Sequence, residues 1–351
     1  SLEQIVCTPK VELHAHLFGS IRVSVLQQIK ERSLDREEKA SSQSLAKAEQ
    51  DASRIKGRCI GIGDAFQYFS AVYELVRTRD DIVFALEEVL ADFHRDNVVY
   101  LELRTTLKTI PEEGIDPAGY VALLVEKLHA AGRQYPMVVR LILSIDRASL
   151  TDAERARVEV TRVLDLAELY PDWIVGVDIA GDPRKGDILP ALALLKKEVL
   201  AADGRLHGKL KITIHTAEIE GQEEETKAIL ALKPHRIGHG CYLTDSQRAE
   251  TLQENAVVEL CPTSNLRTLN LKGFEDHHFA YYYAQKAHCT GVCICTDDIG
   301  LFDTSLSEEL YCAARAFNLS MSDIVCMQKA ALRAAFCTTA LLHLLGGPDV
   351  R

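Results

Sequence analysis

Short apolar runs rich in β-branched residues recur along the chain, and longer stretches with a helical spacing of apolar positions separate them. This alternation is typical of βαβ units, in which consecutive strands pair in parallel and helices cover them. We count eight strand-like runs: Val11–Leu13, Val98–Leu103, Val138–Ile145, Ile174–Ile179, Leu210–Ile214, Arg236–Gly238, Val257–Leu260 and Val292–Thr296. Eight parallel strands with intervening helices predict an α/β fold of the (β/α)8 TIM-barrel type.

Two regions exceed the simple repeat of strand and helix. Residues 33–57 are rich in Ser, Lys, Glu and Ala, which predicts a mobile or helical insertion within a single barrel domain spanning residues 1–351. Amphipathic helices are then expected at residues 64–69 and 81–96, where apolar side chains recur on one stripe. Closing helices are expected over residues 306–345, after the last strand.

The composition limits the classes of function that need to be considered. Lys and Arg number 40 and Asp and Glu 51, so the net charge of −11 (40 − 51) argues against general binding of nucleic acid or anionic membranes. No run reaches the ~20 apolar residues of a membrane span, and no leader pattern is visible. The ten cysteines are irregularly spaced and several lie inside apolar runs, which favours buried free thiols over a framework of disulfides. We expect a cytoplasmic monomer that acts on a small molecule.

Polar side chains follow every predicted strand, at the end of the barrel where active sites of this fold lie. They are His14–His16, Arg104–Thr106, Asp146 with Arg147, Asp178 with Gly181 and Asp182, His215–Glu218, His239, Thr263–Asn265, and Asp297 with Asp298. A single polar strand end is commonplace. Several ends that carry histidine or paired carboxylates together indicate a catalytic face.

A metal site is the first candidate on this face. His14 and His16 flank Ala15, so the two-residue period of a strand places both imidazoles on the same side. A lone His-x-His pair also occurs by chance. His215 ends the fifth run and Asp297 follows the eighth, and together the four side chains predict one zinc ion that activates a water for hydrolysis. The alternative is that His215 and Asp297 merely end a strand and a loop.

Other residues near these ends suit hydrolysis to different degrees. Glu218, three residues past His215, fits a proton shuttle, and His239 at the end of the sixth run fits a group that orients the attacking oxygen. His235 precedes the same run, so we expect it at the opposite end of the barrel in a structural role. We expect His277 and His278, beside aromatic residues on a helix, to serve packing or surface roles.

Four segments resemble the signature segments of the adenosine deaminase family and stand in the same order. They are Lys10–Leu17, His215–Glu218, His235–Gly240 and Thr296–Gly300, and the resemblance extends from about residue 9 to residue 307. It implies that His14, His16, His215 and Asp297 bind zinc.

The same resemblance implies roles around the purine ring. Glu218 would donate a proton to the ring nitrogen beside the attacked carbon, and His239 would hold the hydroxide and stabilise the developing alkoxide. Asp298 would be the acceptor for the nitrogen of the five-membered ring, and the backbone of Gly181 would donate to the remaining pyrimidine nitrogen. Each of these residues follows a predicted strand.

Two positions depart from the family pattern. Phe18 stands where Asp or Asn usually contacts the sugar, and a phenyl ring cannot accept that hydrogen bond. Recognition of the sugar must then differ, or be relayed by Ser20 or Arg22. Ala217 stands where Gly is usual, and we expect its methyl group to tighten the pocket.

Further segments resemble the subgroup of the family that acts on N(6)-methyl-AMP more than the nucleoside enzymes. They are Leu101–Lys108, Leu143–Arg147, His16–Arg22 apart from Phe18, Asp276–Phe279 and Thr304–Ser307. Thr105, Thr106 and Lys108 would offer hydroxyls and a cation to a phosphate, and Arg147 a bidentate contact. The alternative is that Arg104 pairs with Glu102 or Asp146 and that Lys108 is solvated.

We therefore predict a zinc-dependent aminohydrolase that converts N(6)-methyl-AMP, or a related 6-amino or 6-alkylamino purine monophosphate, to IMP and an amine. A nucleoside deaminase acting on adenosine and a non-catalytic purine-binding protein of the same fold are the alternatives. A broader amidohydrolase is a third. Many such barrels hold a second metal with a lysine after the fourth strand, and Asp178–Gly181 contains none, which favours one ion per chain.

Overall fold

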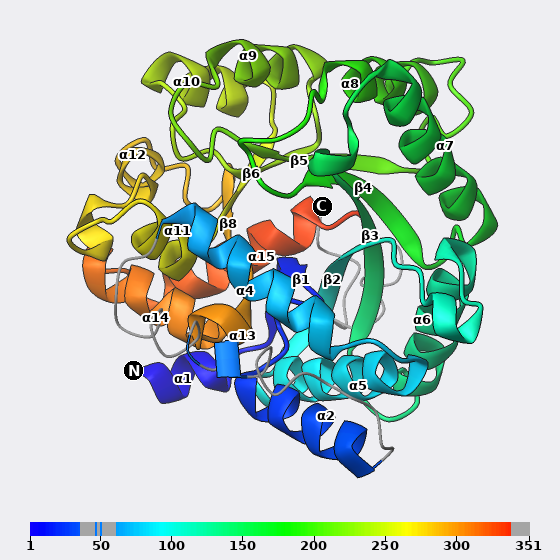
Figure 1. Ribbon diagram of the computed structural model, residues 1–351. Helices are drawn as coiled ribbons and strands as arrows, with labels where there is room; N and C mark the ends of the chain where they lie inside the picture. Colours follow the sequence, from blue (N-terminus) through cyan, green and yellow to red (C-terminus); the bar gives the residue numbers. More distant parts are fainter. Residues whose placement is uncertain (36–45, 48–49, 51–60, 338–351) are drawn as a thin grey trace.

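The computed structural model describes residues 1–35, 46–47, 50 and 61–337, and its strands form one parallel sheet in which they lie in chain order (Figure 1). The strands are β1 (Lys10–His16), β2 (Val98–Thr106), β3 (Val138–Asp146), β4 (Ile174–Ala180), β5 (Lys211–Thr216), β6 (Arg236–His239), β7 (Val257–Leu260) and β8 (Val292–Ile294). Each begins within one residue of its predicted run, and the predicted α/β barrel is confirmed.

The barrel closes at a single point between its first and last strands. Ala15 pairs with Asp297 in an isolated parallel bridge beyond the end of β8. The amide of His16 donates to the carbonyl of Asp297 at 2.9 Å, and the amide of Asp297 donates to the carbonyl of His14 at 2.8 Å. The barrel is therefore nearly closed, and the bridge that closes it holds Asp297 against the two histidines of β1.

Helices surround the strands (Figure 1). They are α1 (Leu2–Val6), α2 (Val23–Asp35), α4 (Ile62–Leu75), α5 (Arg79–Arg95), α6 (Pro117–Ala131), α7 (Ala153–Leu169), α8 (Leu189–Leu195), α9 (Glu223–Leu232), α10 (Asp245–Gln253), α11 (Pro262–Thr268), α12 (Phe279–Ala284), α13 (Ile299–Phe302), α14 (Leu306–Phe317) and α15 (Met321–Ala334), with short turns η1 (Pro111–Glu113), η2 (Arg147–Ser149), η3 (Lys196–Leu200) and η4 (Phe274–Asp276). The helices expected at residues 64–69 and 81–96 correspond to α4 and α5.

The closing helices expected after the last strand correspond to α14 and α15. The last part of that prediction, residues 338–345, lies outside the described residues. So does most of the insertion expected at residues 33–57, of which only residues 33–35, 46–47 and 50 are described.

In helix α5 the local sequence determines both where the helix begins and which of its faces is buried. The Thr78 side chain accepts from the amide of Asp81, and the Asp81 side chain accepts in return from the amide of Thr78, which completes a capping box. Ile82, Phe84 and Val89 then recur on the buried stripe that packs toward the strands. The cap sets where the helix begins, and the stripe sets which face turns inward.

Charged side chains fill much of the barrel interior. Glu12 and His14 on β1, Arg104 on β2, Arg236 on β6 and Glu259 on β7 are each at most 1% exposed. A buried charge is costly unless it is paired, and the two arginines, His14 and Glu259 are paired across the barrel. Glu12 instead accepts from the amides of His14 and Thr296. Arg104 forms ion pairs with Asp178 and Glu259, and Arg236 forms ion pairs with Glu102 and Glu259.

The chain that follows α15 closes the end of the barrel where the strands begin. The amide of Phe336 donates to Glu102 Oε1 at 2.6 Å, and Arg236 Nη1 donates to the carbonyl of Ala334 at 2.8 Å. The guanidinium of Arg236 lies 3.5 Å from the centroid of the Phe336 ring. This segment therefore contacts the interior charges directly.

The cysteines in the described part of the chain are all free thiols. Cys261, Cys293 and Cys295 are buried, whereas Cys7 is exposed. Over the same residues, no helix combines the length and the apolar character that crossing a membrane requires.

Candidate metal centre and active site

The four residues expected to bind a metal point ligand atoms at one another. His16 Nε2 lies 3.3 Å from His14 Nε2 and 3.1 Å from His215 Nε2. Asp297 Oδ1 lies 3.4 Å from the Nε2 atoms of both His14 and His16. Three imidazoles and one carboxylate are a donor set that suits a divalent ion such as zinc. The side chains come from β1, from β5 and from the closing bridge after β8.

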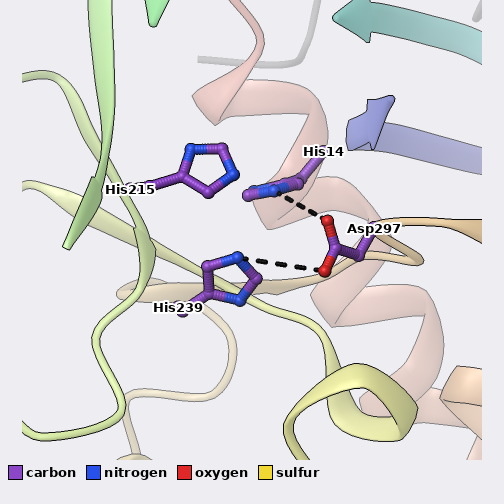
Figure 2. Close-up of side chains that lie close together, drawn as sticks. All are labelled: His14, His215, His239 and Asp297. Atoms are coloured by element: carbon purple, nitrogen blue, oxygen red, sulfur yellow. Dashed lines mark ion pairs between the residues drawn. The ribbon is translucent and has the colours of Figure 1, made fainter. Parts of the chain in front are cut away.

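His239, at the end of β6, reaches the same point. Its Nε2 lies 3.9 Å from Asp297 Oδ2. Ligand atoms of His14, His215, His239 and Asp297 all lie within 4.8 Å of one another, and the four side chains are buried (Figure 2). By distance alone, either His16 or His239 can be the fourth ligand beside His14, His215 and Asp297.

Carboxylates behind two of the histidines orient the rings. His14 Nδ1 lies 2.7 Å from Glu259 Oε2, and His215 Nδ1 lies 3.1 Å from Asp178 Oδ1. An ionised carboxylate only accepts, so each Nδ1 carries the ring proton and each Nε2 turns its lone pair to the shared point. Asp297 is held as well, because its Oδ2 accepts from Ser264 Oγ at 2.8 Å.

The roles of Glu259 and Asp178 as partners of histidines are not predicted from the local sequence pattern. Burial alone would raise the pKa of each carboxyl group, yet interactions with Arg104 and Arg236 hold the pKa of Glu259 below its ordinary value, and interactions with His215 and Arg104 do the same for Asp178. Both carboxylates are therefore ionised partners. A charged residue in the middle of a buried strand is the signal that would have found them.

Glu218 stands beside His239, with 3.9 Å between its Oε2 and His239 Nε2. Burial raises the pKa of Glu218 to about 7, so the side chain holds a proton near neutral pH. Such a carboxyl group can donate a proton to a substrate in the cavity.

Ala217 makes the turn that brings Glu218 over the metal point. Its φ of 51° lies in the left-handed region, which costs a residue with a Cβ roughly 1–2 kcal/mol. The residue is buried and is not part of the cavity wall, so its methyl group does not narrow the pocket, contrary to expectation. The substitution of Ala for Gly acts here on the backbone of the turn.

A cavity of about 270 Å³ lies over the carboxyl ends of the strands. Helix α4 crosses the barrel in Figure 1, and its Phe66, Phe69 and Tyr73 form part of the cavity wall. The wall also includes the following residues singled out in the sequence: His16, Phe18, Thr105, Thr106, Lys108, Gly181, His215, Glu218, His239, Asp297 and Asp298.

Lys108 is held in this wall by aromatic rings. Its Nζ lies 3.3 Å from the ring centroid of Tyr73 and 4.8 Å from that of Phe18, and the two rings pack edge to face at 5.1 Å. Within the described residues, no carboxylate lies within ion-pair distance of Lys108. Burial lowers the pKa of Lys108 to about 8, despite the charge of Asp146. Lys108 is thus a partly desolvated cation on the cavity wall, not a solvated one.

The side chains of the two threonines at the end of β2 already make hydrogen bonds within the protein. Thr105 Oγ1 lies 2.6 Å from the hydroxyl of Tyr120, and the side chain of Thr106 hydrogen-bonds that of Tyr73. Both residues still line the cavity.

Arg147 does not lie where the sequence places it. Its Nη1 and Nη2 donate to the two carboxylate oxygens of Glu225 at 3.0 and 2.6 Å, and its Nε donates to the carbonyl of Lys185. The turn η2 that follows β3 directs the side chain toward α9, and Arg147 is not part of the cavity wall. The expected contact between Arg147 and a phosphate in this cavity is therefore wrong.

Neither residue suggested as a relay to the sugar reaches the cavity. Arg22 forms ion pairs with Asp92 and Asp303, and Ser20 is fully buried away from the wall. Phe18 itself lines the cavity and presents an apolar ring there.

The suggested pairing of Arg104 with Glu102 or Asp146 is also wrong, because Arg104 pairs with Asp178 and Glu259.

Asp298 and Gly181 line the part of the wall expected to contact the purine. Asp298 Oδ1 is buried, and it has no hydrogen-bond partner among the described residues. Burial and the charges of Asp297 and Glu218 hold the pKa of Asp298 well above its ordinary value. A ring nitrogen without a hydrogen can only accept, so a protonated Asp298 would act as the donor there, not as the expected acceptor. Gly181 has a φ of 108° that favours glycine.

Three further histidines are placed by the structure. His235 precedes β6 and its Nδ1 accepts from the amide of Ile212, at the end of the barrel opposite the cavity. His277 and His278 immediately precede α12, and His277 is buried whereas His278 is partly buried. His277 Nε2 lies 3.0 Å from Asn265 Oδ1, and His278 Nε2 lies 2.9 Å from the carbonyl of His239.

Known proteins resemble this chain over nearly its whole length. A family model described as adenosine deaminase matches residues 9–342. An adenosine deaminase-like protein of Drosophila melanogaster is 34% identical over 334 residues, which are 94% of this chain and 92% of that protein. An N6-mAMP deaminase of Arabidopsis thaliana is 33% identical over 360 residues, covering 95% of this chain and 94% of that protein. The crystal structure of Arabidopsis ADAL complexed with IMP is 32% identical with a TM-score of 0.81, covering 98% and 96% of the two chains.

Proposed function

The chain belongs to the adenosine deaminase family of aminohydrolases, and from this premise we propose that it is a zinc-dependent deaminase of purine nucleoside monophosphates. We propose N(6)-methyl-AMP as the substrate, with IMP and methylamine as products. The two relatives compared above carry the names of the adenosine deaminase-like and N6-mAMP deaminase subgroup, which the sequence also resembles.

The observation that carries the proposal is the convergence of four ligand atoms on one buried point. The Nε2 atoms of His14, His16 and His215 and Oδ1 of Asp297 would hold the ion. Zinc at such a site acts as a Lewis acid that lowers the pKa of a water molecule toward ~7. The hydrogen bonds from Nδ1 of His14 to Glu259 and of His215 to Asp178 support this reading, because they leave both Nε2 lone pairs free for a metal.

Glu218 and His239, which lie beside this point, have different roles in the hydrolysis. Glu218 donates its proton to N1 of the purine as the oxygen of water forms a bond to C6. His239, 3.9 Å from Glu218, stabilises the negative charge that develops on that oxygen. The bond from C6 to the exocyclic nitrogen then breaks. Of the two protons of water, one restores the proton of Glu218 and the other leaves on the amine, so the product keeps on N1 the proton that Glu218 gave.

Lys108 supports a nucleotide over a nucleoside. Its ammonium group lies on the cavity wall against the rings of Tyr73 and Phe18, without a carboxylate partner in the described chain. A desolvated cation of this kind gains most from a phosphate, whose charge replaces the missing ion pair. Thr106 on the same wall adds a hydroxyl. The IMP complex of Arabidopsis ADAL lends support, because that protein binds a purine monophosphate.

A panel of substrates tests the proposal with the zinc-loaded protein. Adenosine, AMP, N(6)-methyl-AMP and other 6-substituted monophosphates are compared by kcat/KM. We expect the monophosphates to be turned over and N(6)-methyl-AMP to be preferred. Turnover of adenosine alone would remove the claim for the phosphate. Zinc-loaded protein that binds these purines without converting any would instead indicate a non-catalytic purine-binding protein.

A further inference from the structure

A chain of hydrogen bonds runs from a backbone amide to the ring of His239. The amide of Phe279 donates to His277 Nδ1 at 3.0 Å. A backbone N–H can only donate, so His277 Nδ1 carries no proton. Burial keeps the pKa of His277 well below its ordinary value, so the ring is neutral and its one proton is on Nε2. His277 must therefore donate through Nε2.

The next link is the side chain of Asn265, on α11. His277 Nε2 lies 3.0 Å from Asn265 Oδ1, which accepts that proton. This contact settles the orientation of the amide group, and its Nδ2 lies 3.2 Å from His239 Nδ1. The amide nitrogen is a donor, so His239 Nδ1 is an acceptor without a proton. The three side chains are at most 4% exposed, so solvent does not compete for these bonds.

The ring of His239 is thus held in the opposite way to the rings of His14 and His215. Those two donate through Nδ1 to Glu259 and Asp178, which leaves a lone pair on Nε2. His239 accepts at Nδ1, so a neutral ring carries its proton on Nε2, which faces Glu218 and Asp297 at 3.9 Å. A nitrogen that carries a proton has no lone pair to give to a metal.

We propose that Asn265 and His277 are positioning residues that hold His239 in the tautomer with its proton on Nε2, so that His239 donates a hydrogen bond to the reacting oxygen and does not bind the metal. His16 is then the third imidazole ligand. The role toward the reacting oxygen rests on the proposed deaminase function, whereas the assignment of the tautomer does not.

The backbone of His239 is anchored by the residue next to His277. His278 Nε2 donates to the carbonyl of His239 at 2.9 Å, and the rings of His277 and His278 stack with 4.2 Å between their centroids. His239 has a φ of 59°, a strained conformation that persists only when its surroundings hold it. One dipeptide therefore restrains the His239 backbone directly and, through Asn265, the His239 ring.

Nuclear magnetic resonance on the wild-type protein tests the tautomer directly. Zinc-loaded protein labelled with 15N-histidine is examined by long-range 1H–15N correlation, and the His239 signals are assigned by their loss in His239→Gln. We expect a protonated Nε2 and an unprotonated Nδ1 for His239. A proton on Nδ1, alone or together with one on Nε2, would overturn the proposal.

Asn265→Asp tests the positioning role, because a carboxylate accepts where the amide donated. We expect the His239 proton to move to Nδ1 and kcat to fall about 10²–10³-fold, the usual cost of losing one donor to a developing oxyanion. KM and the zinc content per chain should change little. A variant that keeps its zinc and its wild-type kcat would contradict the proposal.

His278→Gln is the matched control for the tautomer. His278 is adjacent to His277 in the chain and also contacts His239, but its hydrogen bond goes to the backbone carbonyl of His239 and not to the His239 ring. We expect the His239 signals of this variant to keep the wild-type tautomer, and a change to Nδ1–H would overturn the assignment to Asn265 and His277. If the wild-type protein converts no purine, the deaminase function fails while the correlation spectrum still decides the tautomer.

Discussion

His14 Nδ1 lies 2.7 Å from Glu259 Oε2, and both side chains are fully buried. The same carboxylate accepts hydrogen bonds from Arg104, from Arg236 Nε at 2.6 Å and from Thr213 Oγ1 at 3.0 Å. One group therefore connects a candidate metal ligand on β1 with cations on β2 and β6. The orientation of His14 depends on this shared carboxylate.

Replacing that carboxylate by an amide should weaken metal binding. In Glu259→Gln one of the two side-chain atoms becomes a donor and can no longer accept from either His14 or an arginine. We expect zinc affinity to fall about 10–100-fold, the usual cost of losing such a partner. Competition with a chromogenic chelator measures the affinity. Glu309→Gln is the matched control, because Glu309 is also a fully buried carboxyl but, within the described part of the chain, contacts Thr263 and Thr304 and no histidine. Equal affinities for the two variants would contradict the expectation.

Glu218→Gln should separate metal binding from turnover. The amide keeps the size of the side chain, but its N–H protons are not acidic, so it cannot transfer a proton to the purine. We expect kcat to fall about 10²–10⁴-fold, the range of general acid catalysis. Zinc per chain, measured by atomic absorption, should equal the wild-type value. Retained turnover would refute the role of Glu218 as proton donor.

Lys108→Met should distinguish nucleotide from nucleoside recognition. Methionine keeps much of the packing against Tyr73 and Phe18 but removes the charge. A hydrogen bond to a charged group contributes about 1.5–3 kcal/mol, so kcat/KM for N(6)-methyl-AMP should fall about 10–100-fold. The matching nucleoside serves as the internal control and should be turned over at an unchanged rate. An equal loss for both compounds would show that Lys108 does not contact the phosphate.

The stability of the protein should depend on pH through Glu309 on α14. Burial raises the pKa of Glu309 from 4.5 to about 7, although Thr263 and Thr304 donate to it. The folded state binds this proton more tightly than the unfolded state, so the stabilisation is fully present below pH 4.5 and is lost as the pH rises through about 7. At about 1.4 kcal/mol per pKa unit, the loss is on the order of 3 kcal/mol.

Glu309→Gln removes this titration. Free energies of unfolding in urea, measured at several pH values between 4 and 8, should therefore fall less steeply with pH for the variant than for the wild type. The zinc concentration is kept constant in both series. Parallel curves would show that Glu309 does not titrate in this range.

Local patterns in the sequence determined the strands and the face that carries the candidate site. Parallel strands are buried on both sides, so they stand out as short apolar runs, and all eight begin within one residue of the prediction. The carboxyl ends of the strands in a barrel share one end. The positions of His14, His16, His215 and Asp297 along the chain were therefore enough to predict that the four side chains lie close together.

Contacts between segments that are far apart in the chain set which side chains surround that site and which turn away from it. Glu259 meets His14 across 245 residues, His277 reaches His239 through Asn265, and Arg147 turns away to Glu225. Contacts of this kind depend on how the barrel closes and on the direction in which each strand-end turn sends its side chain. A local pattern of apolar and polar residues carries neither, because it specifies which face a residue lies on and not which distant residue faces it.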